Sequence, residues 1–219
     1  MTARVAPVVV EEVSGAPSEL HEDRWPVAGV VTVRLCSFTD PALVIGSTQS
    51  KSIVGVVDGI EVVQRRSGGG AVLLIPGDSV WIDVYVPSTD RRWRANISRS
   101  FGVVGSAWVL ALDAAGLTVH DGGLDVDQLG RLVCFAGVGP GEVLDGSRKL
   151  VGIAQRRTRW GSRFQCLVHH RFDAAMHSHL LGLEVDAEVL DRRVAVMSEP
   201  ARPAAATLLA ERLAAALQR

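Results

Sequence analysis

The sequence predicts an α+β fold in which a largely antiparallel or mixed β-sheet packs with helices. Short runs of β-branched and apolar residues recur in both halves of the chain. The connections between them are of hairpin length, which excludes a regular alternation of parallel strands and crossover helices. One strongly amphipathic segment lies between the two β regions, and further helical segments follow near the C-terminus.

The elements can be assigned in order along the chain. Residues 1–27 carry scattered prolines and no regular hydrophobic period, so we expect an irregular N-terminal lead-in there. Strands follow, because apolar and β-branched runs alternate with turn-forming residues. These expected strands cover residues 30–35, 42–45, 60–64, 71–75 and 80–86.

The central helix is expected over residues 96–115, where apolar side chains recur at intervals of three and four up to Gly116. We expect residues 28–219 to form a single domain ending in a helical tail, because no long polar linker divides them. The remaining expected elements are strands over 132–136, 142–144, 150–155 and 163–169, a hairpin turn at 145–147, and helices over 173–183 and 203–218.

Composition excludes several classes of protein. With 23 Lys and Arg against 24 Asp and Glu, the chain lacks the basic field of a nucleic-acid-binding protein. No apolar run reaches the roughly 18 residues of a membrane helix, and acidic residues interrupt the N-terminus, so we expect a cytoplasmic protein without membrane contact. The 3 widely spaced cysteines suggest neither a disulfide framework nor a zinc cluster.

A glycine-rich loop between two expected strands is the sharpest local signal. Successive glycines cost backbone entropy unless the chain approaches a ligand closely or adopts a positive φ. Backbone N–H groups of such a loop can hold an anion, and arginines add bidentate donors, although a hairpin with solvated arginines explains the composition equally well. The Lys-Ser/Thr pair of a nucleotide-binding P-loop is absent. The loop reads Arg65, Arg66, Ser67, Gly68, Gly69, Gly70 and Ala71.

A second motif begins at Lys149, on an apolar strand that includes Gly152 and Ala154. A lysine at such a place can neutralise a phosphate or polarise an acyl carbonyl, the alternative being a solvated hairpin lysine. Cys134 precedes a glycine-rich loop and can act as a nucleophile if that loop brings it to Lys149. Otherwise it is a small buried apolar side chain.

Together the two motifs resemble the hallmark motifs of the superfamily of lipoate-protein ligases, octanoyltransferases and biotin-protein ligases, in the same order and at a similar separation. The resemblance covers residues 28–185 and implies the catalytic-domain fold of these ligases. It also implies that the loop from Arg65 to Ala71 binds the acyl chain or its phosphate, with Lys149 contacting the acyl carbonyl. Further substrate contacts are implied for Gln49, Gly152 and Ala154.

The resemblance implies an enzyme that attaches a lipoyl or octanoyl group to a lysine of a lipoyl-carrier domain, on an acyltransferase subunit of a 2-oxoacid dehydrogenase or on the glycine-cleavage H protein. A ligase would activate lipoate or octanoate with ATP and Mg²⁺ as an acyl-adenylate. The spacing of Cys134, Glu142 and Lys149 instead resembles the cysteine-dependent octanoyl and lipoyl transferases. There an acyl group passes from acyl carrier protein or a lipoyl protein through a thioester, here on Cys134, without a cofactor.

Three departures from the family's pattern keep a second class of function open. Residues 73–78 lack the family's His-Asp pair, Ser50 replaces an asparagine, and residues 164–167 replace a His-Gly run. They motivate the alternative that the chain is a non-catalytic module that binds an acyl or biotin-like ligand.

Two further clusters remain. The arginines around the turn at 158–162 either dock an acidic carrier domain or form a solvated hairpin. The histidines at 169, 170, 177 and 179 do not have the spacing of a standard zinc site, so we expect no metal ligand.

Overall fold

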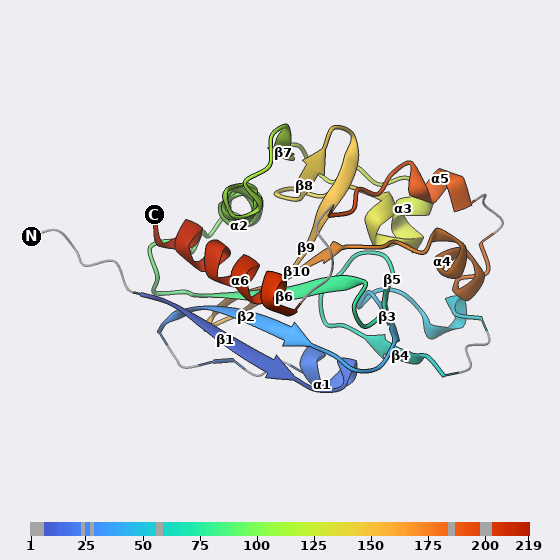
Figure 1. Ribbon diagram of the computed structural model, residues 1–219, viewed down its shortest axis with the longest axis horizontal. Helices are drawn as coiled ribbons and strands as arrows, with labels where there is room; N and C mark the ends of the chain where they lie inside the picture. The colour runs from blue at the N-terminus through green and yellow to red at the C-terminus, as the bar shows by residue number, and fades with distance from the viewer. Residues whose placement is uncertain (1–6, 23–24, 27–28, 56–58, 184–186, 198–202) are drawn as a thin grey trace, which may run out of the picture.

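The computed structural model describes residues 7–22, 25–26, 29–55, 59–183, 187–197 and 203–219, which form two β-sheets and the helices around them (Figure 1). The large sheet has seven strands in the order β1-β2-β6-β10-β9-β8-β7, and the small sheet has three, in the order β4-β3-β5. No helix among these residues is long and apolar enough to cross a membrane.

The large sheet is antiparallel except at one edge, where β1 runs parallel to β2. Its centre is made by three long strands whose residues alternate between two covered faces. On β10, Phe164 and Cys166 belong to the core under the long helices, whereas Gln165 and Leu167 line a pocket on the other face. The strands are β1 (Val8–Ser14), β2 (Val31–Ser37), β6 (Ser79–Pro87), β7 (Leu117–Val119), β8 (Val143–Asp145), β9 (Arg148–Thr158) and β10 (Gly161–His169).

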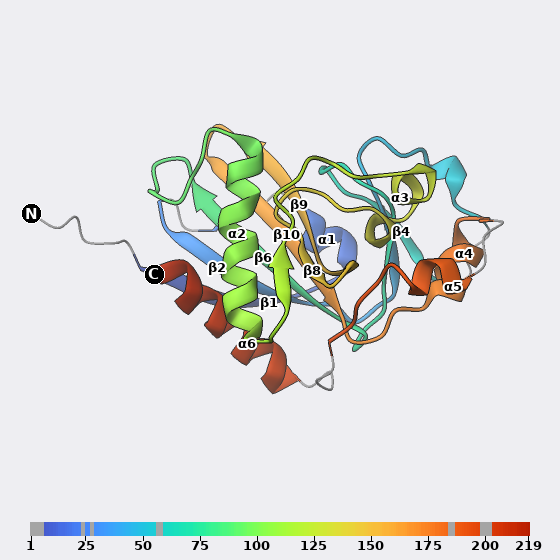
Figure 2. The same cartoon turned by 90° about the horizontal axis from the view of Figure 1, so that it is seen from above.

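Two long helices, α2 (Ile97–Leu112) and α6 (Pro203–Gln218), lie together over one face of the large sheet (Figures 1 and 2). Asn96 caps α2 by accepting a hydrogen bond from Arg99 N at 2.9 Å. The fully buried Trp108 of α2 packs in the same apolar cluster as Leu213 of α6. These helices bury one face of the sheet and leave the other free to form a site.

The small sheet stands beside the large one, with β3 (Ala42–Ile45) in its centre. β3 runs parallel to β4 (Glu61–Gln64) and antiparallel to β5 (Val72–Leu74). One face packs on apolar side chains of helices gathered at this end of the molecule, and the other turns toward the large sheet (Figure 2). The short helices are α3 (Gln128–Leu132), α4 (Ala174–Leu180), α5 (Ala187–Asp191) and the 3₁₀ turns η1 (Lys51–Ile53) and η2 (Cys134–Ala136).

The predicted α+β class with a mixed sheet packed against helices is confirmed. The helix over 203–218 has the bounds that its leucine stripe predicts. The predicted strands match to within three residues at each end, except the one expected over 132–136. The central helix stops at Leu112 because Asp113 adopts the left-handed conformation with φ of 49°.

Two predicted segments are wrong. Residues 8–21 are not an irregular lead-in, because β1 pairs with β2 and is followed by a short helix, α1 (Pro17–His21), with proline in its first turn. The strand expected over 132–136 is replaced by the end of α3 and by η2, since Asp127 caps α3 by accepting a hydrogen bond from Gly130 N at 2.8 Å. The short elements β7 and α5 were not anticipated.

Candidate active site

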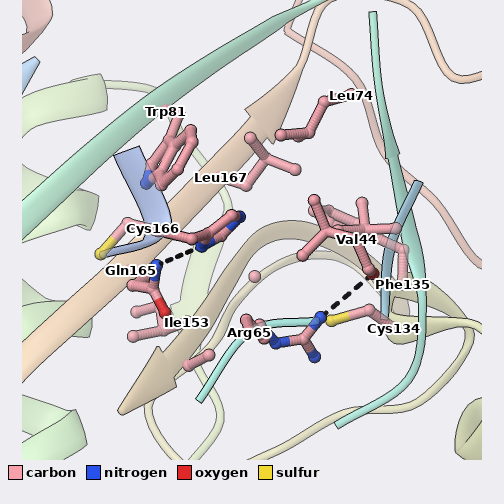
Figure 3. Close-up of a pocket in the computed structure, with 14 residues that line it drawn as sticks. Val44, Arg65, Leu74, Trp81, Cys134, Phe135, Ile153, Gln165, Cys166 and Leu167 are labelled. Carbon is pink, nitrogen blue, oxygen red and sulfur yellow. Dashed lines mark hydrogen bonds between the residues drawn. The ribbon is translucent and has the colours of Figure 1, made fainter. Parts of the chain in front are cut away.

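A pocket with a cavity of about 50 Å³ lies between the two sheets (Figure 3). Trp81, Leu74 and Leu167 lie at one end, and Arg65 and Cys134 lie at the opposite end (Figure 3). An apolar channel with polar groups at one end suits a hydrocarbon chain with a polar head. The lining residues are His21, Val44, Arg65, Val72, Leu74, Trp81, Cys134, Phe135, Gly152, Ile153, Ala154, Gln165, Cys166 and Leu167.

Arg65 holds the glycine-rich loop in shape from inside. Its guanidinium is buried and donates hydrogen bonds to the carbonyls of Val44 at 3.3 Å and of Gly68 and Gly70, both at 2.8 Å. Burial lowers the pKa of Arg65, and its interactions with Cys134 and Glu142 oppose that shift. Arg65 Nε is buried and has no hydrogen-bond partner among the described residues, so a ligand can use it.

The other loop residues differ in exposure. Arg66, Gly68 and Gly69 are exposed, whereas Ser67 is buried and donates from Oγ to Gln165 Oε1 at 3.1 Å. Gly69 has a φ of +102°, which only glycine adopts readily. The loop therefore presents backbone and one arginine to solvent and anchors the rest.

Gly70 and Ala71 pack directly against the turn that carries Cys134. Ala71 O accepts a hydrogen bond from Cys134 N at 2.8 Å, and Ala71 N donates to Leu132 O at 2.7 Å. A Cβ at position 70 would stand 2.7 Å from both Val133 C and Cys134 N. Glycine at this position is required by close contact between two backbones, which the sequence indicated in general terms only.

Gly70→Ala is expected to lower the free energy of unfolding by about 1–3 kcal/mol, because backbone must shift to admit the methyl group. Gly68→Ala is the matched control, since its Cβ would meet nothing within 4 Å, and we expect a change within about 0.5 kcal/mol. Urea unfolding measures both. Equal losses in the two variants would contradict the packing argument.

Lys149 is buried with its ammonium beside the Cys134 turn. Nζ donates to the carbonyls of Cys134 at 2.7 Å and Gly137 at 3.0 Å, and it lies 4.0 Å from Cys134 Sγ. It also forms an ion pair with Glu142 Oε1 at 2.7 Å, with both side chains at most 6% exposed. The structure thus brings together the two residues that the resemblance makes catalytic, with Cys134 facing the pocket and Lys149 fixing its turn.

Glu142 is a residue of this site whose contacts the sequence did not reveal. Its Oε2 accepts from Gly139 N at 2.7 Å and its Oε1 from Ile153 N at 3.0 Å, in addition to the pair with Lys149. The signal that could have found it is the hairpin turn at 145–147, which places Leu144 opposite Lys149. Glu142 therefore ties the 137–141 loop to the strand that carries Lys149.

The implied substrate contacts at Gln49, Gly152 and Ala154 separate into two kinds. Gly152 and Ala154 line the pocket. Gln49 instead braces the chain, because its Oε1 accepts from Gly46 N at 2.8 Å and its Nε2 donates to Arg131 O and Leu132 O.

The arginines of the β9–β10 hairpin do not form one surface. Arg163 is buried and pairs with Asp83 at 2.6 Å, while Arg157 donates to the carbonyls of Arg94 and Ala95. Arg159 stacks on Trp160, which is 61% exposed. The expectation that these arginines are solvated is therefore wrong for Arg163.

The histidines near the end of β10 act in packing. His177 Nε2 accepts a hydrogen bond from Leu73 N at 3.0 Å, and the buried His169 ring lies 4.5 Å from the Phe135 ring. Burial lowers the pKa of His169 to about 3, so that ring is neutral. Across the described ranges, no group of three or more His, Cys, Asp or Glu side chains is arranged to hold a metal ion.

The fold is that of a catalytic domain of the ligase and transferase type, as comparison with known proteins shows. Residues 21–218 match the family described as the lipoyl protein ligase A/B catalytic domain. The chain belongs to this family, which confirms the superfamily that its two motifs resemble. No curated protein matches the chain.

Solved structures show the same fold at low sequence identity. Lipoate-protein ligase A bound with ATP is 19% identical, with a TM-score of 0.70 over 97% of this chain and 85% of that chain. The bipartite lipoate protein ligase from Thermoplasma acidophilum, described with its E2 lipoyl domain, is 18% identical with a TM-score of 0.71 over 97% and 84%. Protein Ta0514 from T. acidophilum with bound lipoic acid is 19% identical with a TM-score of 0.68 over 97% and 86%.

Proposed function

We propose that this protein attaches a lipoyl or octanoyl group to a lysine of a lipoyl-carrier domain. The carrying observation is the buried Lys149 ammonium 4.0 Å from Cys134 Sγ, at the polar end of an apolar pocket. Family membership supports it, as do the neighbours described with lipoic acid and with an E2 lipoyl domain.

The apolar and polar ends of the pocket support a proposed place for each part of the substrate. In this proposal the hydrocarbon chain lies toward Trp81, and the acyl carbonyl lies at the Cys134 end. There the Lys149 ammonium can turn from its carbonyl partners to the acyl oxygen, whose developing negative charge it stabilises. Arg65 Nε and the exposed N–H groups of the loop are the donors for a carboxylate or phosphate.

Between the two routes, the geometry favours transfer through Cys134. Its sulfur lines the pocket beside Lys149, so it can attack the carbonyl of a carrier-bound acyl group, forming a thioester and releasing the carrier thiol. The acceptor lysine then attacks the thioester, forming the amide and restoring the Cys134 thiol. ATP would supply activation of a free acid by the other route. The loop donors fit its phosphates, but the described residues form no metal cluster, so Mg²⁺ would be held mainly by those phosphates.

Intact mass spectrometry of an isolated lipoyl-carrier domain tests the proposal. The pure protein is incubated with the carrier and octanoyl or lipoyl acyl carrier protein, and separately with lipoate, ATP and Mg²⁺. We expect the acyl mass on the carrier lysine. Absence of that mass under both conditions overturns the proposed function.

Cys134→Ala is expected to lower the rate of transfer from an acyl carrier by about 100-fold or more, and to abolish the acylated form of the enzyme, since the variant lacks the thiol that lies beside Lys149 at the pocket. Cys36→Ala is the control, because that thiol is buried, contacts Arg34 O and does not line the pocket. Mass spectra of the enzyme during turnover report the adduct. Full ATP-dependent activity of Cys134→Ala would assign the ligase route instead.

The structure also offers one observation in favour of a non-catalytic binding module. Glu142 forms an ion pair with Lys149, and the carbonyls of Cys134 and Gly137 accept hydrogen bonds from the Lys149 ammonium. The ammonium is therefore already paired within the protein. A ligand-binding module would bind lipoate or a biotin-like acid in calorimetry without product under either donor condition. Multiple turnovers exclude this alternative.

A further inference from the structure

Two residues that line the pocket carry a buried nitrogen with no hydrogen-bond partner among the described residues: Arg65 at Nε and His21 at Nε2. They belong to opposite ends. Arg65 lies beside Cys134 (Figure 3), whereas the centroid of the His21 ring lies 4.4 Å from that of the Trp81 ring. A buried donor without an acceptor destabilises a fold, so each of these nitrogens indicates a ligand atom that accepts from it.

The His21 ring is fixed from several sides. Arg163 donates to the carbonyls of Leu20 at 2.6 Å, Glu22 at 2.9 Å and His21 itself at 3.4 Å, which holds the end of α1 over the pocket. The ring stacks on Trp81 with 31° between the two planes. The His21 ring is therefore a fixed part of the pocket wall.

A short chain of hydrogen bonds determines which ring nitrogen carries the proton. Ser67 Oγ donates to Gln165 Oε1, so the amide nitrogen of Gln165 faces His21 Nδ1, at 2.9 Å. An amide N–H only donates, so Nδ1 accepts. Burial, with the positive charges of Arg163 and Arg65, lowers the pKa of His21 to about 3, so the ring is neutral at pH 7 and its single proton is on Nε2.

The rest of this end of the pocket is hydrocarbon and indole. Trp81, Leu74 and Leu167 offer no donor to the tail of a chain, because the Trp81 N–H is taken by Asp83 Oδ1 at 2.8 Å. A saturated acyl tail would leave Nε2–H unpaired in a dry site. A tail that carries a weak acceptor, such as a disulfide sulfur, would satisfy it and would also contact the indole favourably.

We propose that His21 is a specificity-determining residue that donates a hydrogen bond from Nε2 to a ring sulfur of the dithiolane at the far end of a lipoyl chain. It thereby selects lipoyl groups over saturated chains such as octanoyl. The inference rests on the proposed function, which left the choice between these groups open.

The test compares two acids of the same shape. Lipoic acid and 5-cyclopentylpentanoic acid have the same chain and a five-membered ring, but the second has carbon in place of sulfur. Calorimetry with the unaltered protein is expected to show about tenfold tighter binding of lipoic acid. In His21→Phe, which keeps a ring against Trp81 and lacks the nitrogen, the ratio is expected to fall close to one, with thermal unfolding checking that the variant is folded.

Equal binding of the two acids by the unaltered protein overturns the inference, and this comparison needs no variant. So does an unchanged preference in folded His21→Phe. Failure of the proposed function looks different, because then no acyl mass reaches the carrier lysine from any donor. If the carrier lysine is acylated but lipoic acid does not bind more tightly than its carbon analogue, the inference about His21 fails and the proposed function stands.

Discussion

Arg163→Met is expected to lower the free energy of unfolding by about 3–5 kcal/mol, because it leaves the Asp83 carboxylate buried without its cation. The two side chains are 2% and 0% exposed, and Arg163 donates to Asp83 Oδ2 through both Nε and Nη2. Burial raises the pKa of Asp83, and Arg163 acts against that shift. The same guanidinium holds the carbonyls at the end of α1, so its loss also frees His21.

Urea unfolding monitored by circular dichroism measures this effect. The double variant Asp83→Leu, Arg163→Met removes both charges and is expected to recover most of the loss. Arg148→Met breaks an ion pair with Asp145 at 3.0 Å in which both side chains are about half exposed, so we expect a change within about 0.5 kcal/mol. A loss in Arg163→Met no greater than that of Arg148→Met would show that burial of the pair has no energetic consequence.

The fold could be predicted where the determining pattern is local. The leucines of α6 recur with the period of a helix and report the face that it buries. The nearly continuous apolar and β-branched run of β6 is typical of a strand that is buried on both faces. β1 was missed although its valines are β-branched, because two adjacent glutamates break its alternation and the strand depends on a parallel partner 23 residues later. Short elements depend on tertiary contacts more than on propensity.

The residues of the site could likewise be predicted from the sequence only where the pattern that identifies them is local. The glycine-rich loop and Lys149 were recognised because each motif is contiguous, and their neighbours in sequence explain them. His21 and Gln165 are 144 residues apart, and no spacing rule connects them. Asp83 and Arg163 lie 80 residues apart, and only the antiparallel register of β6 and β10 brings their strands together. The polar groups that position a pocket wall are therefore visible only in three dimensions.

Lys149→Met is expected to lower the rate of acyl transfer by about 1,000-fold or more by either route, because it removes the ammonium placed to stabilise the acyl oxygen in the thioester or in the adenylate. This effect differs from that of Cys134→Ala, which concerns one route alone. Single-turnover transfer to the carrier lysine, followed by mass spectrometry, measures it.

Loss of fold must be separated from loss of chemistry, since Lys149→Met also leaves the Glu142 carboxylate buried without its cation. Adding Glu142→Gln removes that charge and keeps one oxygen, which can accept from the N–H of Gly139 or of Ile153 but not from both, so the double variant is expected to regain part of the stability and to remain inactive. If the stable double variant transferred acyl groups within about tenfold of the unaltered rate, the Lys149 ammonium would be an anchor for the Cys134 turn, and catalysis would depend on the thiol and the loop donors.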